Sequence, residues 1–409
     1  MLSIEVHVHG SRNESLAAGL LMRVLVSSVG RDSQPTGICR VAASHTKALL
    51  SHRIASRVLF AIGAWQYELF RTFLEPHLTQ IEFLVANIRN NSAARNFWYV
   101  AKLPQLAKAH GADLVHLAYP APTFRRAFRG PVVVTLHDLY PYDMPEIFGF
   151  PRYYANRAIL RQCLSSVDGI ACVSNTTRSR LGEIFPGIVQ RVPTVVTGNY
   201  VETPSEPPAP PVSLEEMGPD GFVLAVAQHR KNKNLDILIR GFTELVGIGG
   251  FQGSLVIVGS EGPETAALHE LSKSVGAPGR VKFIQSILDT ELHWLYAHCS
   301  IFVACSSIEG YCLPLAEARA NRARIVCSDI AILREIGGTR CIYFSLTDDV
   351  IHNLVSAMKA CMDQAASETS PDFRSCGSGV LEEYSMLYSR VIASRARYMT
   401  LDTHTTAAS

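Results

Sequence analysis

Short apolar segments alternate with helical patterns along nearly the whole chain of 409 residues, and this alternation limits the folds open to it. In the first half, the predicted buried strands are 22–29, 56–62, 81–85, 113–117, 131–136, 169–173 and 192–196. The series begins again with FVLAVA (222–227) and SLVIVG (254–259), followed by VKFI, IFVAC, RIVCS and CIYF. Short strands separated by helices are typical of parallel sheets with helices on both faces. The sequence therefore predicts an α/β protein with two doubly wound, Rossmann-like domains.

A proline-rich segment separates the two series of strands. Residues 202–221 (ETPSEPPAPPVSLEEMGPDG) contain six prolines, a composition that neither a sheet nor a helix can continue. The predicted division of the chain is 1–201 for an N-terminal domain, 202–221 for the linker, 222–378 for a C-terminal domain, 379–398 for a final amphipathic helix and 399–409 for a disordered tail. Met22 opens the first strand directly, so we expect residues 1–21 to be a loose extension or to precede the native start.

Several classes of protein are excluded by what the sequence lacks. An apolar fraction of 47% excludes a disordered polymer, and no run approaches the ~20 apolar residues of a membrane-spanning helix. The first residues carry no secretory signal pattern, and the ten scattered cysteines include no Cys-x-x-Cys pair, which favours reduced core residues in a cytoplasmic protein. Neither a Gly-x-Gly-x-x-Gly fingerprint nor a Walker-type loop is present, so dinucleotide oxidoreductases and P-loop ATPases lose their main support.

The formal net charge of +2 is the sum of two unlike halves. Residues 1–200 carry 21 Lys and Arg against 12 Asp and Glu, whereas residues 201–409 carry 17 against 24. The resulting +9 and −7 indicate that the first half meets an anionic partner. Chance scatter of solvated surface charge is the alternative explanation.

The stretch SSIEGYCLPLAEARA (306–320) has the most specific pattern of polar residues. Glu309 and Glu317 are separated by a loop that leads into a helix, with Pro314 near the first turn, where a missing N–H does no harm. The free N–H groups of that turn and the helix dipole suit an anionic ligand. Glu317 could accept hydrogen bonds from a ribose and Glu309 from a hexose. The alternative is a loop glutamate and a helix-surface glutamate in ordinary ion pairs.

Together with its surroundings, this stretch resembles the retaining glycosyltransferases of family 4, which have the two-domain GT-B fold. In the second half, the resemblance rests on EGYCLPLAE with its E-x7-E spacing, SDIAILREIGG (328–338), QHRKNKNLDILIRGF (228–242) and LDTELHWLYAHCSIFVACSSIEGY (288–311). In the first half it rests on the weaker segments SQPTGICRV (33–41), TLHDLYPYD (135–143) and ACVSNTTRSRL (171–181). It covers about residues 22–390, and it implies that the two domains face each other across a cleft.

The resemblance implies a metal-independent transfer of a hexosyl group from a nucleoside-diphosphate sugar to a glycan or lipid-linked saccharide. Such a reaction belongs to the synthesis of cell-surface polysaccharide such as lipopolysaccharide, and it needs no cofactor beyond the donor substrate. The C-terminal domain would hold the nucleotide, with Glu317 on the ribose, Arg230 and Lys233 on the diphosphate and Glu309 on the sugar. Cations preorganised at a leaving diphosphate stabilise the charge that develops there. Taken by itself, the basic segment could be a solvated surface turn.

Five further residues complete the predicted site. The resemblance implies that His137 hydrogen-bonds the donor sugar and supports the forming oxocarbenium ion through its side chain or carbonyl. Gly37 would let the backbone approach the diphosphate or acceptor, and Gly310, Cys312 and Leu313 would line the donor site. The alternatives are a histidine that caps a strand end and an ordinary turn glycine. No Asp-x-Asp metal motif is present.

The chain departs from the family pattern at a few positions. The family usually has small or aromatic–glycine residues at the loop that holds Cys312, and Gly and Pro where this chain has Arg322 and Arg324. None of these changes removes a presumed catalytic group. Ser174 and Thr176 are further candidates for the edge of the cleft.

The basic first half would face the acceptor. Its arginines could contact anionic lipid or a lipid-diphosphate acceptor, giving peripheral contact with the inner face of the cell membrane, and no nucleic-acid partner is expected. They are Arg125, Arg126, Arg129, Arg152, Arg157 and Arg161. One alternative is a sugar-nucleotide epimerase or a glycan phosphorylase of the same architecture; this chain is short for a phosphorylase. Another alternative is a non-catalytic relic that binds a nucleotide or a glycan. A relic has no reason to keep Glu309, Glu317, Arg230 and Lys233 together.

Overall fold

The computed structural model describes residues 22–395 apart from 35, 202–205, 212–219, 277–278, 286 and 364–381. The predicted extension (1–21), the predicted tail (399–409) and most of the predicted linker lie outside the described residues. The strands are β1 (Met22–Ser27), β2 (Ala55–Gly63), β3 (Ile81–Ala86), β4 (Leu114–Leu117), β5 (Val132–Leu136), β6 (Gly169–Cys172), β7 (Thr194–Val196), β8 (Phe222–Val226), β9 (Ser254–Val258), β10 (Val281–Ile284), β11 (Ile301–Ala304), β12 (Ile325–Ser328) and β13 (Cys341–Phe344).

The helices alternate with these strands. They are α1 (Gly37–Ser51), α2 (Tyr67–Phe73), α3 (Ser92–Ala101), α4 (Leu103–Ala109), α5 (Tyr140–Asp143), α6 (Arg152–Ser165), α7 (Asn175–Ile184), α8 (Pro186–Arg191), α9 (Leu235–Gly247), α10 (Thr265–Ser274), α11 (Asp289–His298), α12 (Leu313–Ala320), α13 (Ala331–Gly337), α14 (Val350–Asp363) and a last helix over 382–395. Short 3₁₀ turns occur at η1 (Ala64–Gln66), η2 (Glu75–Gln80), η3 (Arg125–Ala127), η4 (Pro145–Ile147), η5 (Lys231–Lys233) and η6 (Gly338–Arg340).

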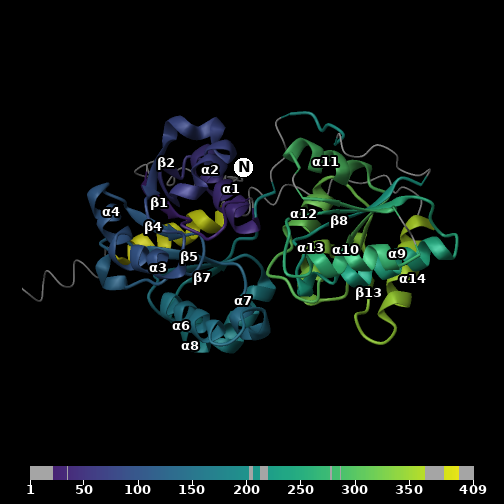
Figure 1. Ribbon diagram of the computed structural model, residues 1–409. Helices are drawn as coiled ribbons and strands as arrows, with labels where there is room; N and C mark the ends of the chain where they lie inside the picture. The colour runs from purple at the N-terminus through teal and green to yellow at the C-terminus, as the bar shows by residue number, and fades with distance from the viewer. Residues whose placement is uncertain are drawn as a thin grey trace, which may run out of the picture.

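Two separate parallel sheets organise the molecule. The first has the order β3-β2-β1-β4-β5-β6-β7 and the second the order β10-β9-β8-β11-β12-β13. The strand pairings within each sheet are parallel. The two domains stand side by side, with α7 and α13 between the sheets (Figure 1). The predicted fold class, two doubly wound α/β domains, is confirmed.

Both sheets are buried on both faces. Leu25 of β1 belongs to one apolar layer of the N-terminal domain, whereas its neighbours Val24 and Val26 belong to the other. Successive side chains of a strand point to opposite faces, so a strand covered on both sides is apolar throughout. This arrangement explains why the strands appear in the sequence as continuous apolar runs.

The strand order of the second sheet reverses between β8 and β11. β9 and β10 extend the sheet beyond β8, whereas β12 and β13 extend it beyond β11. In open α/β sheets, the loops at the carboxyl ends of the two strands at such a reversal diverge and form a ligand-binding site. The loops in question are 227–234 after β8 and 305–312 after β11, and these hold the predicted donor-site residues.

The last helix returns to the N-terminal domain. Residues 382–395, the yellow helix in Figure 1, bury Tyr384 and Tyr388 against that domain. The Tyr388 hydroxyl lies 2.5 Å from Nδ1 of His116 and 3.1 Å from Nε2 of His45, and Nε2 of His116 lies 2.7 Å from the Thr135 hydroxyl. Burial lowers the pKa of His45 to about 3 and lowers that of His116, so both rings are neutral. Polar groups can be buried here because they hydrogen-bond one another.

Within the part of the chain that the structure describes, no helix combines the length and the apolar character that a membrane span requires.

Candidate active site

A buried ion pair joins the two loops at the carboxyl edge of the second sheet. Lys233 lies in η5 after β8, and its ammonium group binds Oε1 of Glu309, in the loop after β11. The Ser306 hydroxyl donates to the same carboxylate at 2.7 Å, and the Glu309 side chain is only 7% exposed. Burial by itself lowers the pKa of Lys233, but the charge of Glu309, its hydrogen bond and the nearby Cys312 together outweigh burial, and the pKa is raised. Lys233 is therefore a fixed cation.

Two asparagines hold these loops together. Asn232 is buried; its side-chain amide donates to the Ile308 carbonyl at 3.3 Å, and its own carbonyl accepts from the Ser307 N–H at 2.9 Å. Asn234 has a left-handed backbone (φ 48°), and its side chain donates to the Cys305 carbonyl at 2.9 Å. Asparagine tolerates this conformation better than most residues. Sequence reasoning missed both roles, although the two residues flank Lys233.

Arg230 is a second cation of this loop, and its contacts differ from those of Lys233. Among the described residues, no hydrogen bond or ion pair to its guanidinium is found, whereas neighbouring Lys233 is paired. Lys231, between them, is exposed to solvent. Arg230 is thus available for an anionic ligand next to a cation that is already fixed in place.

Glu317 is held by a tyrosine and faces the other domain. The Tyr296 hydroxyl donates to Oε2 of Glu317 at 2.8 Å. Burial raises the pKa of Glu317, while Arg40 of the N-terminal domain and Tyr296 oppose that rise. Arg40 also makes a 2.6 Å ion pair with Asp289 of α11. The carboxylate predicted for the ribose therefore lies where an N-terminal-domain cation approaches the C-terminal domain.

The backbone of Gly310 touches the N-terminal domain directly. A Cβ at this position would lie 1.8 Å from the carbonyl oxygen of His137, so only glycine fits. The imidazole Nε2 of His137 lies 2.8 Å from the Ala118 carbonyl and must donate to it, which leaves Nδ1 as an acceptor. Burial lowers the pKa of His137 and keeps the ring neutral. The structure thus brings the predicted residues His137 and Gly310 together with Glu309.

Three other predicted residues lie in less direct positions. Gly37 is exposed at the start of α1, and among the described residues a Cβ there would meet nothing within 4 Å; its predicted approach to the diphosphate or acceptor stays a prediction. Cys312 precedes α12 with a left-handed backbone (φ 69°), and its side chain packs in the domain core. The expected row of free N–H groups is shorter than predicted, because Leu315 already donates to the Cys312 carbonyl at 3.1 Å and Pro314 has none. Among the described residues no acceptor is found for the backbone N–H of Leu313, so this amide of the first turn is available to a ligand.

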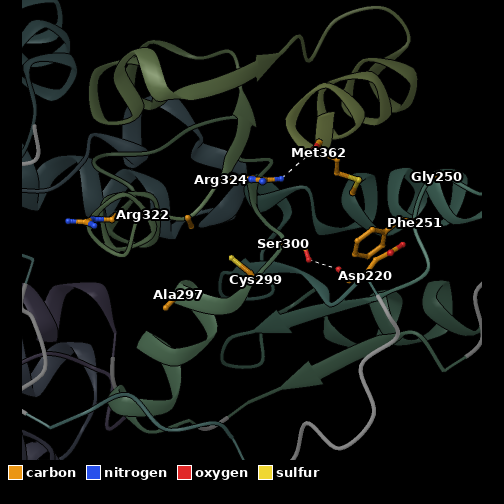
Figure 2. Close-up of a pocket in the computed structure, with 10 residues that line it drawn as sticks. Asp220, Gly250, Phe251, Ala297, Cys299, Ser300, Arg322, Arg324 and Met362 are labelled. Atoms are coloured by element: carbon orange, nitrogen blue, oxygen red, sulfur yellow. Dashed lines mark hydrogen bonds between the residues drawn. The ribbon is translucent and has the colours of Figure 1, made fainter. Parts of the chain in front are cut away.

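Two of the departures from the family pattern, Arg322 and Arg324, lie at the opposite edge of the second sheet. A cavity of about 550 Å³ opens at the amino ends of β8, β11 and β12, and Arg322 and Arg324 line it. Figure 2 shows Arg324 directed toward the Met362 carbonyl, to which it donates at 3.3 Å, and Arg322 pointing away from it. Arg322 has a left-handed backbone (φ 60°), a conformation that glycine adopts without strain. Because this edge is remote from Glu309, the cavity is not the donor site.

The six predicted surface arginines of the first half differ in exposure. Arg125 is held by an ion pair with Asp168 at 2.6 Å, and Arg157 donates to the Pro141 carbonyl at 2.7 Å and lies over two tyrosine rings. Those two are therefore engaged within the domain. The exposed ones are Arg126, Arg129, Arg152 and Arg161.

Asp138, beside His137, predicts a pH-dependent stability. Burial raises its pKa to about 6, with a smaller contribution from Glu309, against an ordinary value of 3.8. A raised carboxyl pKa means that the folded state binds more protons, so this destabilisation is absent below pH 3.8 and complete above pH 6. We expect Asp138→Asn, which can still accept the hydrogen bond from the Tyr140 amide, to stabilise the protein by about 3 kcal/mol at pH 8 and by almost nothing at pH 3.5. Denaturant titrations of both proteins at the two pH values measure this; an equal effect at both would contradict it.

Within the described residues, no group of three or more His, Cys, Asp or Glu side chains is placed to hold a metal ion.

Comparison with known families matches the two domains separately. Residues 36–203 match the family described as Glycosyltransferase Family 4, and residues 212–339 match Glycosyl transferases group 1. "O-antigen chain mannosyltransferase B" of Escherichia coli is 25% identical over 209 residues, which is 50% of this chain and 55% of that protein. "O-antigen chain mannosyltransferase RfbU" of Salmonella typhimurium is 21% identical over 216 residues, 53% of this chain and 57% of that protein. The chain thus spans about half the length of the curated relatives it matches.

Solved structures share the fold over almost the whole chain. HepE of Anabaena, in complex with UDP and glucose, has a TM-score of 0.59 and 17% identity, covering 94% of this chain and 100% of its own. WaaG, "a glycosyltransferase involved in lipopolysaccharide biosynthesis", has a TM-score of 0.60 and 14% identity, covering 91% and 98%. At such low sequence identity, the similarity shows a shared fold and no more. That fold agrees with the two parallel sheets described above. The chain belongs to the family 4 glycosyltransferases, and its two domains have the GT-B architecture.

Proposed function

We propose that this protein transfers a hexosyl group from a nucleoside-diphosphate sugar to a glycan or lipid-linked saccharide, with retention of anomeric configuration and without a metal ion, in cell-surface polysaccharide synthesis. The observation that carries the proposal is the Lys233–Glu309 ion pair beside the guanidinium of Arg230, for which the described residues supply no partner. Two cations at the carboxyl edge of a parallel sheet suit a diphosphate, and one of them is already oriented. Family membership and the names of the curated relatives support the same reaction.

In the proposed reaction, each residue has a separate task. The bond between the sugar C1 and the phosphate oxygen breaks while the acceptor oxygen bonds to C1 on the same face, and the acceptor proton passes to the departing diphosphate. Arg230 and Lys233 stabilise the charge on that diphosphate. Glu309 orients Lys233 through Oε1, which leaves Oε2 to accept from a sugar hydroxyl. Nδ1 of neutral His137 accepts from another sugar hydroxyl.

Glu317 would bind the nucleotide ribose. Its carboxylate already accepts one hydrogen bond from Tyr296, which fixes its direction, and ribose hydroxyls would supply the others. Because Arg40 pairs with Asp289 beside it, the domains would have to part for the donor to reach this place. The nucleotide would then bind the C-terminal domain first, and the acceptor would be bound by the N-terminal domain.

The reaction is tested with a panel of nucleotide sugars. Mannosyl donors come first, because both curated relatives are named mannosyltransferases. Thermal shift identifies the donor, and NMR of the product measures the anomeric configuration. Activity that survives EDTA would support metal independence. Release of nucleoside diphosphate without any acceptor, together with an epimerised sugar, would contradict the transferase assignment.

We further propose that the protein acts on the cytoplasmic side, in peripheral contact with anionic lipid through the exposed arginines of its N-terminal domain. Charge reversal of Arg126, Arg129, Arg152 and Arg161 to Glu is expected to abolish sedimentation with vesicles that contain phosphatidylglycerol. Lys273→Glu, an exposed residue of the other domain, is the control and should leave sedimentation unchanged. Full binding by the quadruple variant would remove this part of the proposal.

A further inference from the structure

One carboxylate of the C-terminal domain caps a helix of the N-terminal domain. Glu335 lies in α13, and Oε1 of its side chain accepts from the backbone N–H of Asn175 at 2.7 Å and from its side-chain amide at 3.1 Å. Its Oε2 accepts from the backbone N–H of Thr176 at 2.9 Å and from the Thr176 hydroxyl at 2.8 Å. Glu335, Asn175 and Thr176 are called the interdomain clasp below. Figure 1 shows α7 and α13 on the facing sides of the two domains.

The start of α7, which the clasp holds, also hydrogen-bonds the loop that carries Glu309. Ser174 caps α7 by accepting from the Thr177 N–H at 3.0 Å, and its hydroxyl donates to the Gly310 carbonyl at 2.9 Å. The Thr177 hydroxyl donates to the same carbonyl at 3.2 Å. Gly310 has no room to move toward His137. One short segment of the N-terminal domain therefore contacts the C-terminal domain both at Glu335 and next to Glu309.

From this geometry we infer that Glu335 is a positioning residue: the interdomain clasp holds the domains in the closed arrangement that sets Glu309 and Lys233 against His137. The inference rests on the proposed transferase function. Glu335 acts through α7 and the Gly310 carbonyl, and it is placed away from the reacting atoms. Loss of the clasp changes the distance between groups supplied by different domains, whereas the nucleotide site within the C-terminal domain stays intact.

The chemistry of the clasp requires a carboxylate. All four of its partners are donors, and two of them are backbone N–H groups at a helix N-terminus, where a negative charge is favourable. The isosteric change Glu335→Gln keeps one acceptor oxygen but turns an NH₂ group toward the other donors. Glu335→Asp keeps the charge and shortens the reach. A matched control is Glu183→Gln, which changes an exposed carboxylate on α7 that pairs with Arg180.

The first measurement is hydrogen exchange of Asn175 and Thr176 in the full-length protein. In Glu335→Gln, we expect these amides to exchange about tenfold faster, because each hydrogen bond to a charged group is worth about one power of ten. Small-angle scattering is expected to show a larger radius of gyration than in the wild type. Glu183→Gln should change neither quantity. Unchanged exchange and scattering in Glu335→Gln would overturn the inference whether or not the protein proves to be a transferase.

The second measurement separates positioning from general stability. For the donor identified above, we expect Glu335→Gln to lower kcat about tenfold while the Kd of the nucleoside diphosphate, measured by calorimetry, changes less than threefold. Glu335→Asp should restore part of kcat, and Thr176→Val in the Glu335→Gln background should add little further loss. A normal kcat in Glu335→Gln with fast exchange would show that the clasp does not position the site. If the wild-type protein transfers no sugar, the proposed function is wrong. The role of the clasp in holding the domains together is then still tested by amide hydrogen exchange and small-angle scattering.

Discussion

Lys233→Ala is expected to lower the rate of glycosyl transfer by about 10²- to 10³-fold, the largest single effect in this protein, because it removes a preorganised cation from the leaving diphosphate. The lysine is effective because it cannot reorient: Glu309 binds it, and its raised pKa keeps it charged. Steady-state kinetics with the identified donor measures kcat and KM, and the loss should fall mainly on kcat, because the charge develops in the transition state.

Lys231→Ala is the matched control for that experiment. It removes the same charge two residues away, from a side chain that is exposed to solvent. We expect its rate to stay within about twofold of the wild type, since an exposed charge is screened by water and salt. Equal losses in the two variants would mean that the loop acts through its general positive charge, and the assigned role of Lys233 would be wrong.

Glu309→Gln should impair both stability and activity. It leaves the Lys233 ammonium enclosed without its counter-charge, so the charge that opposes the effect of burial on the pKa of the lysine is lost. Removing one partner of a buried ion pair costs about 3 kcal/mol; because Lys233 is 19% exposed, we expect about 2 kcal/mol in the free energy of unfolding. The transfer rate should fall about 10²-fold, since both the sugar contact and the orientation of the lysine are lost.

The stability and rate effects of this variant are separable. Denaturant unfolding measures the first, and kinetics well below the unfolding temperature measures the second. Glu244→Gln, an exposed carboxylate on α9, should alter neither. The double variant Lys233→Ala, Glu309→Gln should be less destabilised than the sum of the single variants, because neither charge is then left alone. Strict additivity would contradict a direct role of the pair in stability.

The strands, their alternation with helices and the site loops could be predicted because they depend on local pattern. A strand such as β11, apolar at every position, indicates burial on both faces by itself. Glu309, Lys233 and Arg230 could be placed at the same sheet edge, because parallel strands share the direction of their carboxyl ends. His137 could be predicted as a site residue because it directly follows β5.

Contacts between the domains could not be predicted in this way. Glu335 and Thr176 are 159 positions apart, and the pair Arg40 and Asp289 is 249 apart, so no local periodicity links them. The signal for one end was present: Ser174 and Thr177 have the spacing of a helix N-cap. The residue of the other domain that lies opposite this helix start, Glu335, depends on how the two domains are arranged. The close contact at Gly310 belongs to the same group: a Cβ there would lie against the His137 carbonyl of the other domain, and no local pattern indicates this.

The return of residues 382–395 to the first domain has a consequence for biosynthesis. Tyr384 and Tyr388, which complete the hydrogen bonds of His45, His116 and Thr135, follow the second domain in the chain and leave the ribosome after it. Domains usually fold in the order of their synthesis. Here the first domain is synthesised early, but His45, His116 and Thr135 in its interior still lack their tyrosine partners. The domain can complete its packing only after the second domain has been synthesised. A nascent chain that stops after α14 should therefore carry a folded second domain and an unfinished first one.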